Sequence, residues 1–202
     1  MELRYEISDR PDASLVRAVL AGEPEAFNVL VGRWERKIYS YLVHLTGCRE
    51  EAFDLCQEVF IASYRNLPQL EDSEKFRHWL FRIAHHKANA HTRAARPQHA
   101  DLQELDPAAA PSVLRVGDQG RWEHGELGIL VEQALAELPV EQREAIVLKF
   151  YQGFKLAEIA EIQGCPLNTA KTRLYSAFEH LKKSIETQCG GSFGGLGNPN
   201  GL

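Results

Sequence analysis

The chain has 202 residues, of which 44% are apolar and 25% are charged, and its net charge is −5 at neutral pH. This length allows one ordinary domain or two small ones, and the composition is typical of a soluble globular protein. The sequence contains no apolar run near the roughly 20 residues that a membrane-spanning helix needs. Its first residues also lack the apolar segment of a signal peptide. We therefore expect no direct membrane insertion.

The cysteine pattern indicates neither a disulfide framework nor a metal site. The four cysteines form no C-x-x-C motif, and none stands near a histidine at zinc-finger spacing. We interpret Cys56 and Cys165 as small core residues in a reducing environment. The predicted location is cytoplasmic, and no cofactor or metal is expected.

The N-terminal half predicts four helices, beginning with a short one around residues 15–20. A longer helix follows in GEPEAFNVLVGRWERKIYSYLVHLTG, where Pro24 suits the first turn and Gly47 the end. Its apolar residues recur at the spacing of one helical face. These residues are Phe27, Leu30, Val31, Trp34, Ile38, Tyr41, Leu42 and Leu45.

The third predicted helix, EEAFDLCQEVFIASYRNL, has two different faces. Its core stripe is Ala52, Leu55, Cys56, Val59, Phe60 and Ser63. Its other face is Asp54, Gln57, Glu58, Ile61 and Arg65. This mixture of charge with an apolar side chain fits either an ordinary solvated face or a surface that docks a protein. The pattern then breaks in the loop PQLEDSE.

The fourth predicted helix, residues 75–96, is strongly basic although the whole chain is acidic. It holds six Lys or Arg residues, four His and no Asp or Glu. Its inward stripe is Phe76, Leu80, Ile83 and Ala84. Another face carries His78, Arg82, His85 and Asn89. One interpretation is a surface for phosphates and bases, with Trp79 or Phe81 available for stacking. The alternatives are a solvated polar face and a metal site, and no acid or cysteine joins the histidines to support the latter.

Residues 98–127 show no sustained period and carry a net charge of −4, whereas residues 1–97 sum to zero and residues 128–202 to −1. Two prolines and three glycines favour a flexible linker. The fold class is therefore all-α, with two small helical domains on an acidic linker. The predicted boundaries are 1–97, 98–127, 128–186, and a disordered Gly-rich tail at 187–202.

The second domain contains the sharper motif, a helix-turn-helix. Before it, one helical face is expected at Leu127, Leu130, Val131, Ala134, Leu135 and Leu138. After Pro139, another helix is expected with Ile146, Val147 and Phe150 facing inward.

In the motif itself, a helix at residues 156–162 is followed by a turn at 163–166 and a longer helix from about Asn168. Gly164 can take the positive φ of the turn, and Asn168 or Thr169 can cap the next helix. Leu167, Ala170 and Leu174 are expected to pack inward. This corner presents the start of the second helix to a major groove, although an ordinary helical hairpin has the same spacing.

Several stretches together resemble bacterial sigma factors of the extracytoplasmic-function group. They are GEPEAFNVLVGRW, AFDLCQEVFIASYRNL, FRHWLFRIAHHKANAHTRAARP, LPVEQREAIVLKFYQGFKLAEIAE and GCPLNTAKTRLYSAFEHLKK. They cover most of residues 22–183, in the family's order and separation. Lys155 departs from the family pattern, in which a Ser or Thr cap is common at this position.

The resemblance implies a subunit that binds core RNA polymerase and directs promoter recognition, DNA opening and transcription initiation. The polymerase contacts implied are the β′ clamp and the β flap, with the clamp bound by Asp54, Gln57, Glu58, Ile61 and Arg65. The minus-ten element would be read by Asn66, Lys75, Arg77, His78, Trp79, Arg82, His85, His86, Asn89 and Arg93. The minus-thirty-five element would be read by Asn168, Thr169, Lys171, Thr172, Arg173 and Ser176. A cognate anti-sigma factor is a further implied partner.

The near-neutral charge of both domains fits this interpretation, because a protein with few uncompensated cations binds duplex DNA weakly by itself. We expect no enzyme, since the sequence shows no nucleophile–base pair and no phosphate-binding Gly loop. Two alternative functions remain open from the sequence. One is a stand-alone helix-turn-helix regulator that binds its operator as a dimer. The other is a helical metal-dependent hydrolase using His78, His85 and His86.

Overall fold

The computed structural model describes residues 9–95 and 126–188, and within these ranges the chain is helical with no strand. This confirms the all-α prediction. The first domain consists of α2 (Asp12–Leu20), α3 (Glu25–Thr46), α4 (Arg49–Asn66) and α5 (Phe76–Ala95). Two short 3-10 turns, Leu67–Gln69 and Ser73–Lys75, connect α4 to α5. None of the helices described is long and apolar enough to cross a membrane.

The core of the first domain forms where the apolar faces of α3, α4 and α5 meet. Leu30, Ile38 and Tyr41 of α3 are fully buried there, as the helical period predicts. Gly47 ends α3 with a φ of 71°, a left-handed conformation that glycine adopts without a Cβ clash. The side chain of Asp12 accepts hydrogen bonds from Arg33 and from Trp34 Nε1, and so ties α2 to α3.

The second domain consists of α6 (Glu126–Ala136), α7 (Val140–Ile146), a π turn (Val147–Tyr151), α8 (Leu156–Ile162) and α9 (Leu167–Gln188). Ile146 and Val147 are buried as predicted, but Phe150 is 50% exposed. The prediction that Phe150 faces inward is wrong because the π turn changes the period at this point. Phe154 is buried instead.

The helix-turn-helix corner lies at the predicted position. Gly164 takes a φ of 60°, and the Cys165 N–H bonds to Ala160 O at 3.0 Å to close the turn. The second helix begins at Leu167, and the backbone N–H groups of Thr169 and Ala170 donate to Pro166 O, the residue that precedes the helix. The predicted cap at Asn168 or Thr169 is therefore wrong. Ala170 and Leu174 pack inward, whereas Leu167 is 47% exposed, contrary to the prediction.

The described helices of the second domain extend a little beyond residues 128–186 at both ends. Helix α6 already begins at Glu126, inside the predicted linker, and α9 continues through Thr187 and Gln188 into the predicted tail. The rest of the predicted linker and tail lies outside the described residues. Cys56 is buried as predicted, but Cys165 is only half-buried.

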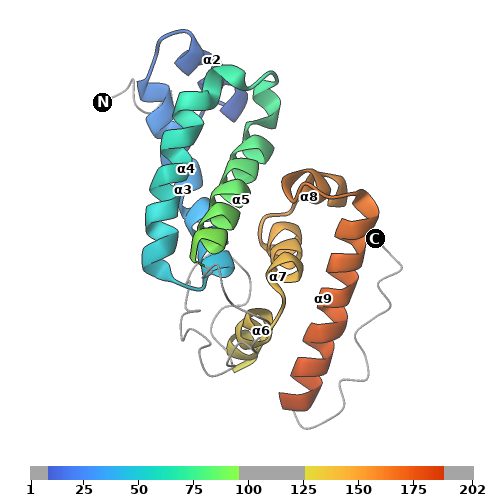
Figure 1. The fold of residues 1–202 in the computed structure, drawn as a ribbon. Helices are drawn as coiled ribbons and strands as arrows, with labels where there is room; N and C mark the ends of the chain where they lie inside the picture. The colour runs from blue at the N-terminus through green and yellow to red at the C-terminus, as the bar shows by residue number, and fades with distance from the viewer. Residues whose placement is uncertain (1–8, 96–125, 189–202) are drawn as a thin grey trace.

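The two domains pack against each other, with α5 beside α8 and α3 beside α7 (Figure 1). Helix α9 lies on the outer side of the second domain, against α6, α7 and α8. Phe154 is buried at the boundary, where its ring meets Phe81 of α5 edge to face at a centroid distance of 5.1 Å. The hydrophobic cores of the two domains are therefore continuous.

Candidate nucleic-acid and polymerase interfaces

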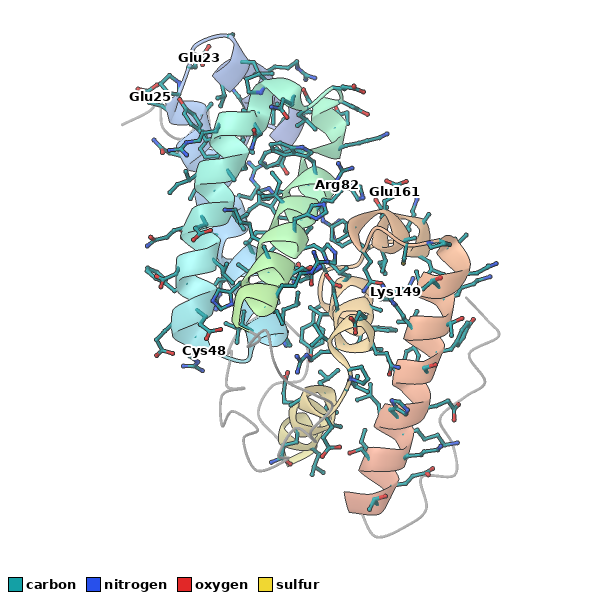
Figure 2. All side chains as sticks on the ribbon, viewed as in Figure 1. Glu23, Glu25, Cys48, Arg82, Lys149 and Glu161 are labelled. Carbon is teal, nitrogen blue, oxygen red and sulfur yellow. The ribbon has the colours of Figure 1, made fainter. Side chains whose placement is uncertain are left out.

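The residues predicted to read the minus-ten element divide into three groups according to their surroundings. The exposed group is Lys75, Arg82, His86 and Arg93. Figure 2 labels Arg82 on the part of α5 that lies nearest α8. These four side chains form the accessible part of the basic helix. The pKa of His86 is lowered, first by partial burial and then by the neighbouring His85 and Arg82, which favours its neutral form.

A second group, Arg77, His78 and His85, faces the second domain. The Arg77 guanidinium donates to Gln152 O and lies 4.1 Å from the centre of the Phe154 ring. Burial lowers the pKa of Arg77, although an arginine stays charged at neutral pH. His78 Nε2 lies 3.3 Å from Glu161 Oε2. These side chains are not open to DNA in this arrangement.

His85 belongs to a buried polar cluster around Glu144 of α7. His85 Nδ1 lies 2.7 Å from Glu144 Oε1, and Tyr41 of α3 donates its hydroxyl to the same oxygen. Gln163 donates to the other carboxylate oxygen at 2.9 Å. Burial and the adjacent Glu144 raise the pKa of Tyr41 well above its usual value. The Glu144 carboxylate of α7 thus joins α3, α5 and the turn that follows α8.

The third group, Asn66, Trp79 and Asn89, is half-buried. The Asn66 side chain donates to Ala62 O at 2.9 Å, and Asn89 Nδ2 lies 2.8 Å from His85 Nε2. Phe81, the alternative stacking residue, is fully buried against Tyr41 and Phe154. Its proposed role in stacking on bases is therefore wrong, which leaves Trp79.

The predicted minus-thirty-five residues lie in the first three turns of α9. Asn168, Lys171 and Thr172 are exposed, and Thr169 and Ser176 are half-buried. Arg173 donates to Gln163 Oε1 at 3.0 Å, a contact that the sequence did not indicate. Helix α8 begins without the Ser or Thr cap that is common in the family. The Glu158 side chain instead accepts a hydrogen bond from the N–H of Lys155, the residue before the helix, at 2.7 Å.

The predicted polymerase-binding face of α4 is exposed along its length. All five of its residues, Asp54, Gln57, Glu58, Ile61 and Arg65, are solvent-accessible. Phe53 and Tyr64 are also exposed on α4, at 57% and 47%, and the sequence analysis did not select them. The helical period could have identified them, because neither residue belongs to the apolar stripe that faces the core. Three large apolar side chains therefore accompany the charges on this helix.

Within the described ranges, no three His, Cys, Asp or Glu side chains are grouped so that they could hold a metal ion. His78 and His85 each approach a different glutamate, and His86 is exposed on another side of α5. This placement does not bring the three histidines of the hydrolase interpretation together around one point.

Comparison with known proteins places the chain in a family. Residues 30–97 match the family model of Sigma-70 region 2, and residues 129–181 match that of Sigma-70, region 4. The RNA polymerase sigma-H factor of Pseudomonas aeruginosa is 30% identical over 186 residues, which are 89% of this chain and 96% of that protein. The ECF RNA polymerase sigma factor SigW of Bacillus subtilis is 31% identical over 177 residues, covering 84% of this chain and 94% of the relative.

Solved structures agree on the fold. A structure of CnrH in complex with the cytosolic domain of CnrY has a TM-score of 0.61 at 22% identity, over 87% of this chain and 97% of that one. The sigma factor RpoE in complex with the anti-sigma factor NepR from Bartonella quintana has a TM-score of 0.59 at 22% identity, over 79% and 96%.

The first helical domain matches sigma-70 region 2, and the helix-turn-helix domain that follows it matches sigma-70 region 4. This order of domains defines a sigma factor. The chain belongs to the extracytoplasmic-function group of the sigma-70 family, and its function is promoter recognition in transcription initiation. None of the comparisons supports a stand-alone regulator.

Proposed function

We propose that this sigma factor docks on the β′ clamp of core RNA polymerase through the exposed face of α4. The surface supports this role because Ile61 is 52% exposed between charged residues, with Phe53 and Tyr64 on the same helix. Apolar side chains with a charged surround are the usual composition of a docking surface. Helix α4 is also left accessible by the second domain.

The exposed basic residues of α5, with the loop at residues 66–75, are proposed to bind the melted minus-ten strand. Unpaired bases can stack on aromatic side chains or enter pockets that a duplex cannot reach. Arg82 and His86 are accessible for phosphate or base contacts, and Trp79 is the aromatic side chain in this region. His78 and His85 join this surface only after the second domain moves away.

The start of α9 is proposed to read the minus-thirty-five element in the major groove. Lys171 and Thr172 project from its first turns, and a recognition helix contacts base edges with its N-terminal residues. Arg173 is held by Gln163 and is assigned a phosphate contact. The same domain would contact the β flap.

The protein is proposed to act in the cytoplasm as a non-enzymatic subunit, with no cofactor. An anti-sigma factor is a proposed partner, because a structurally similar sigma factor has been solved with one. This assignment concerns the kind of partner and not its identity.

The experiment that tests the function is transcription in vitro with core polymerase and a promoter library. We expect promoter-selective transcripts only when both the protein and core polymerase are present. The isolated protein should not shift duplex promoter DNA at moderate salt, because residues 1–97 sum to zero charge and residues 128–202 to −1. Tight duplex binding by the protein alone would contradict the proposal.

A further inference from the structure

The turn of the helix-turn-helix motif contains a buried polar side chain, that of Gln163. The residue is 7% exposed and directly follows α8, where Ile159 and Ile162 lie on the same buried side. Burying an amide without hydrogen-bond partners costs free energy, and apolar residues are the usual occupants of such positions. The contacts of the Gln163 amide must therefore account for its presence here.

The Gln163 amide uses both its donors and its acceptor. Nε2 donates to Glu144 Oε2 at 2.9 Å and to Glu141 O at 3.0 Å, both on α7. Oε1 accepts from Arg173 Nη1 of α9 at 3.0 Å. The opposite orientation of the amide is unfavourable, because its oxygen would face a carboxylate and a carbonyl while its NH2 group would face a guanidinium. The surroundings thus fix which way the amide points.

This contact holds Arg173 without neutralising it. The Arg173 side chain is half-buried, and within the described ranges it forms no ion pair. A guanidinium has five N–H donors, and the bond to Gln163 uses one of them. Glu144 polarises the amide from its far side, which strengthens the bond at the near side. The guanidinium is therefore anchored at one end, and its charge remains available to an anion.

Arg173 lies in the part of α9 that is proposed to meet the major groove. It follows directly after Lys171 and Thr172, which are exposed. A long side chain that is free before binding loses rotamer freedom when a ligand fixes it, and this loss weakens binding. A guanidinium that is already held loses less. The hold does not depend on how the two domains are arranged, because α7, α8 and α9 all belong to the second domain.

We propose that Gln163 is a positioning residue for the minus-thirty-five contact. It links α7 to Arg173 and orients the guanidinium for a DNA phosphate while leaving the positive charge intact. Gln163 acts through Arg173 and not by touching DNA, since its own side chain is buried. The inference rests on the proposed phosphate contact of Arg173 and adds the residue that prepares it.

The test is a double-mutant cycle in the full-length chain assembled with core polymerase. Gln163→Met keeps the approximate length and volume of the side chain and removes the amide. Arg173→Ala and the combination of both changes complete the cycle. The matched control is Ile146→Val, which removes one buried methyl group from the second domain without changing a hydrogen-bonding group. Circular dichroism verifies the helical content of each variant.

The measurement is the Kd of each polymerase complex for a promoter fragment. Gln163→Met should raise this Kd about fivefold, the effect of having to order one long side chain on binding. Arg173→Ala should raise it about thirtyfold, the loss of a charged hydrogen bond. The double variant should also be about thirtyfold weaker rather than about 150-fold, because Gln163 has no effect without Arg173. On a shorter fragment that lacks the minus-thirty-five DNA, all variants should bind equally.

Two results would overturn the positioning role. One is a double variant whose loss equals the product of the two single losses, since Gln163 would then act independently of Arg173. The other is a loss with Ile146→Val as large as that with Gln163→Met, which would indicate a general effect on the domain. If Gln163→Met loses helical content, Gln163→Asn replaces it in the cycle, because its amide is one methylene short of bridging α7 and Arg173.

The same cycle separates this inference from the proposed function. If Arg173→Ala binds the promoter like the unmodified protein, the phosphate contact itself is refuted, and the positioning role falls with it. If Arg173→Ala weakens binding while Gln163→Met does not, the phosphate contact stands and the positioning role alone is refuted.

Discussion

Reversing one charge and replacing one apolar side chain on the exposed face of α4 should weaken docking on core polymerase without unfolding the protein. The variant is Glu58→Arg with Ile61→Asp. Ile61 is 52% exposed, and complete burial of an isoleucine is worth about 1.5–3 kcal/mol, so that covering its exposed half contributes about 1 kcal/mol. Leaving an aspartate against the same apolar surface costs about 1–3 kcal/mol more.

The charge reversal at Glu58 has little effect on folding. Its carboxylate pairs with Lys87 at 2.9 Å, but the two side chains are 55% and 37% exposed, and such surface pairs contribute about 0–1 kcal/mol. The two effects at Ile61 together reduce the binding free energy by about 3 kcal/mol, which corresponds to a Kd for core polymerase that is roughly 150-fold higher.

The assay is a titration of labelled protein with core polymerase, with circular dichroism to verify the helical content. The matched control is Glu23→Arg with Leu20→Asp, because Leu20 is 47% exposed and Glu23 also forms an exposed ion pair, with Arg10. The control should bind like the unmodified protein. If the α4 variant and the control bind core polymerase equally well, the assignment of this face is refuted.

Three further predictions concern other sites. Lys171→Ala should change the ranking of minus-thirty-five variants by about 1–3 kcal/mol per altered contact, whereas Arg173→Ala should weaken all promoters about equally; an unchanged ranking with Lys171→Ala excludes base readout by that residue. Arg82→Ala, and separately His86→Ala, should reduce permanganate reactivity of unpaired thymines more than they reduce the gel shift; equal losses would indicate phosphate contacts alone. Burial raises the pKa of Cys56 to about 11, so only about one Cys56 thiol in a thousand is ionised at pH 8. Iodoacetamide should therefore modify the half-buried Cys48 well before it modifies Cys56. Equal modification rates of the two cysteines in peptide mass mapping would contradict the burial of Cys56.

Much of the local architecture could be predicted from the sequence. The apolar period of 3.6 residues located α3, α4 and α5 and the core face of each helix, because that period reflects which side of a helix is removed from water. Gly164 marked the helix-turn-helix corner, since few other residues tolerate a positive φ. The exposed position of Ile61 followed from its place opposite the core stripe. The motifs and their order were enough to indicate the family.

The tertiary structure decided which neighbour covers each face. Helical periodicity distinguishes buried from exposed sides, but it does not reveal whether a polar side is covered by water, DNA or another domain. His85 and Arg82 were predicted on one polar face, yet His85 is buried against Glu144 while Arg82 is exposed. Likewise the π turn exposes Phe150, and Phe154 takes the buried place at the domain boundary. Such pairings join residues some 60 positions or more apart in the chain, and their energy depends on distances that no local pattern encodes.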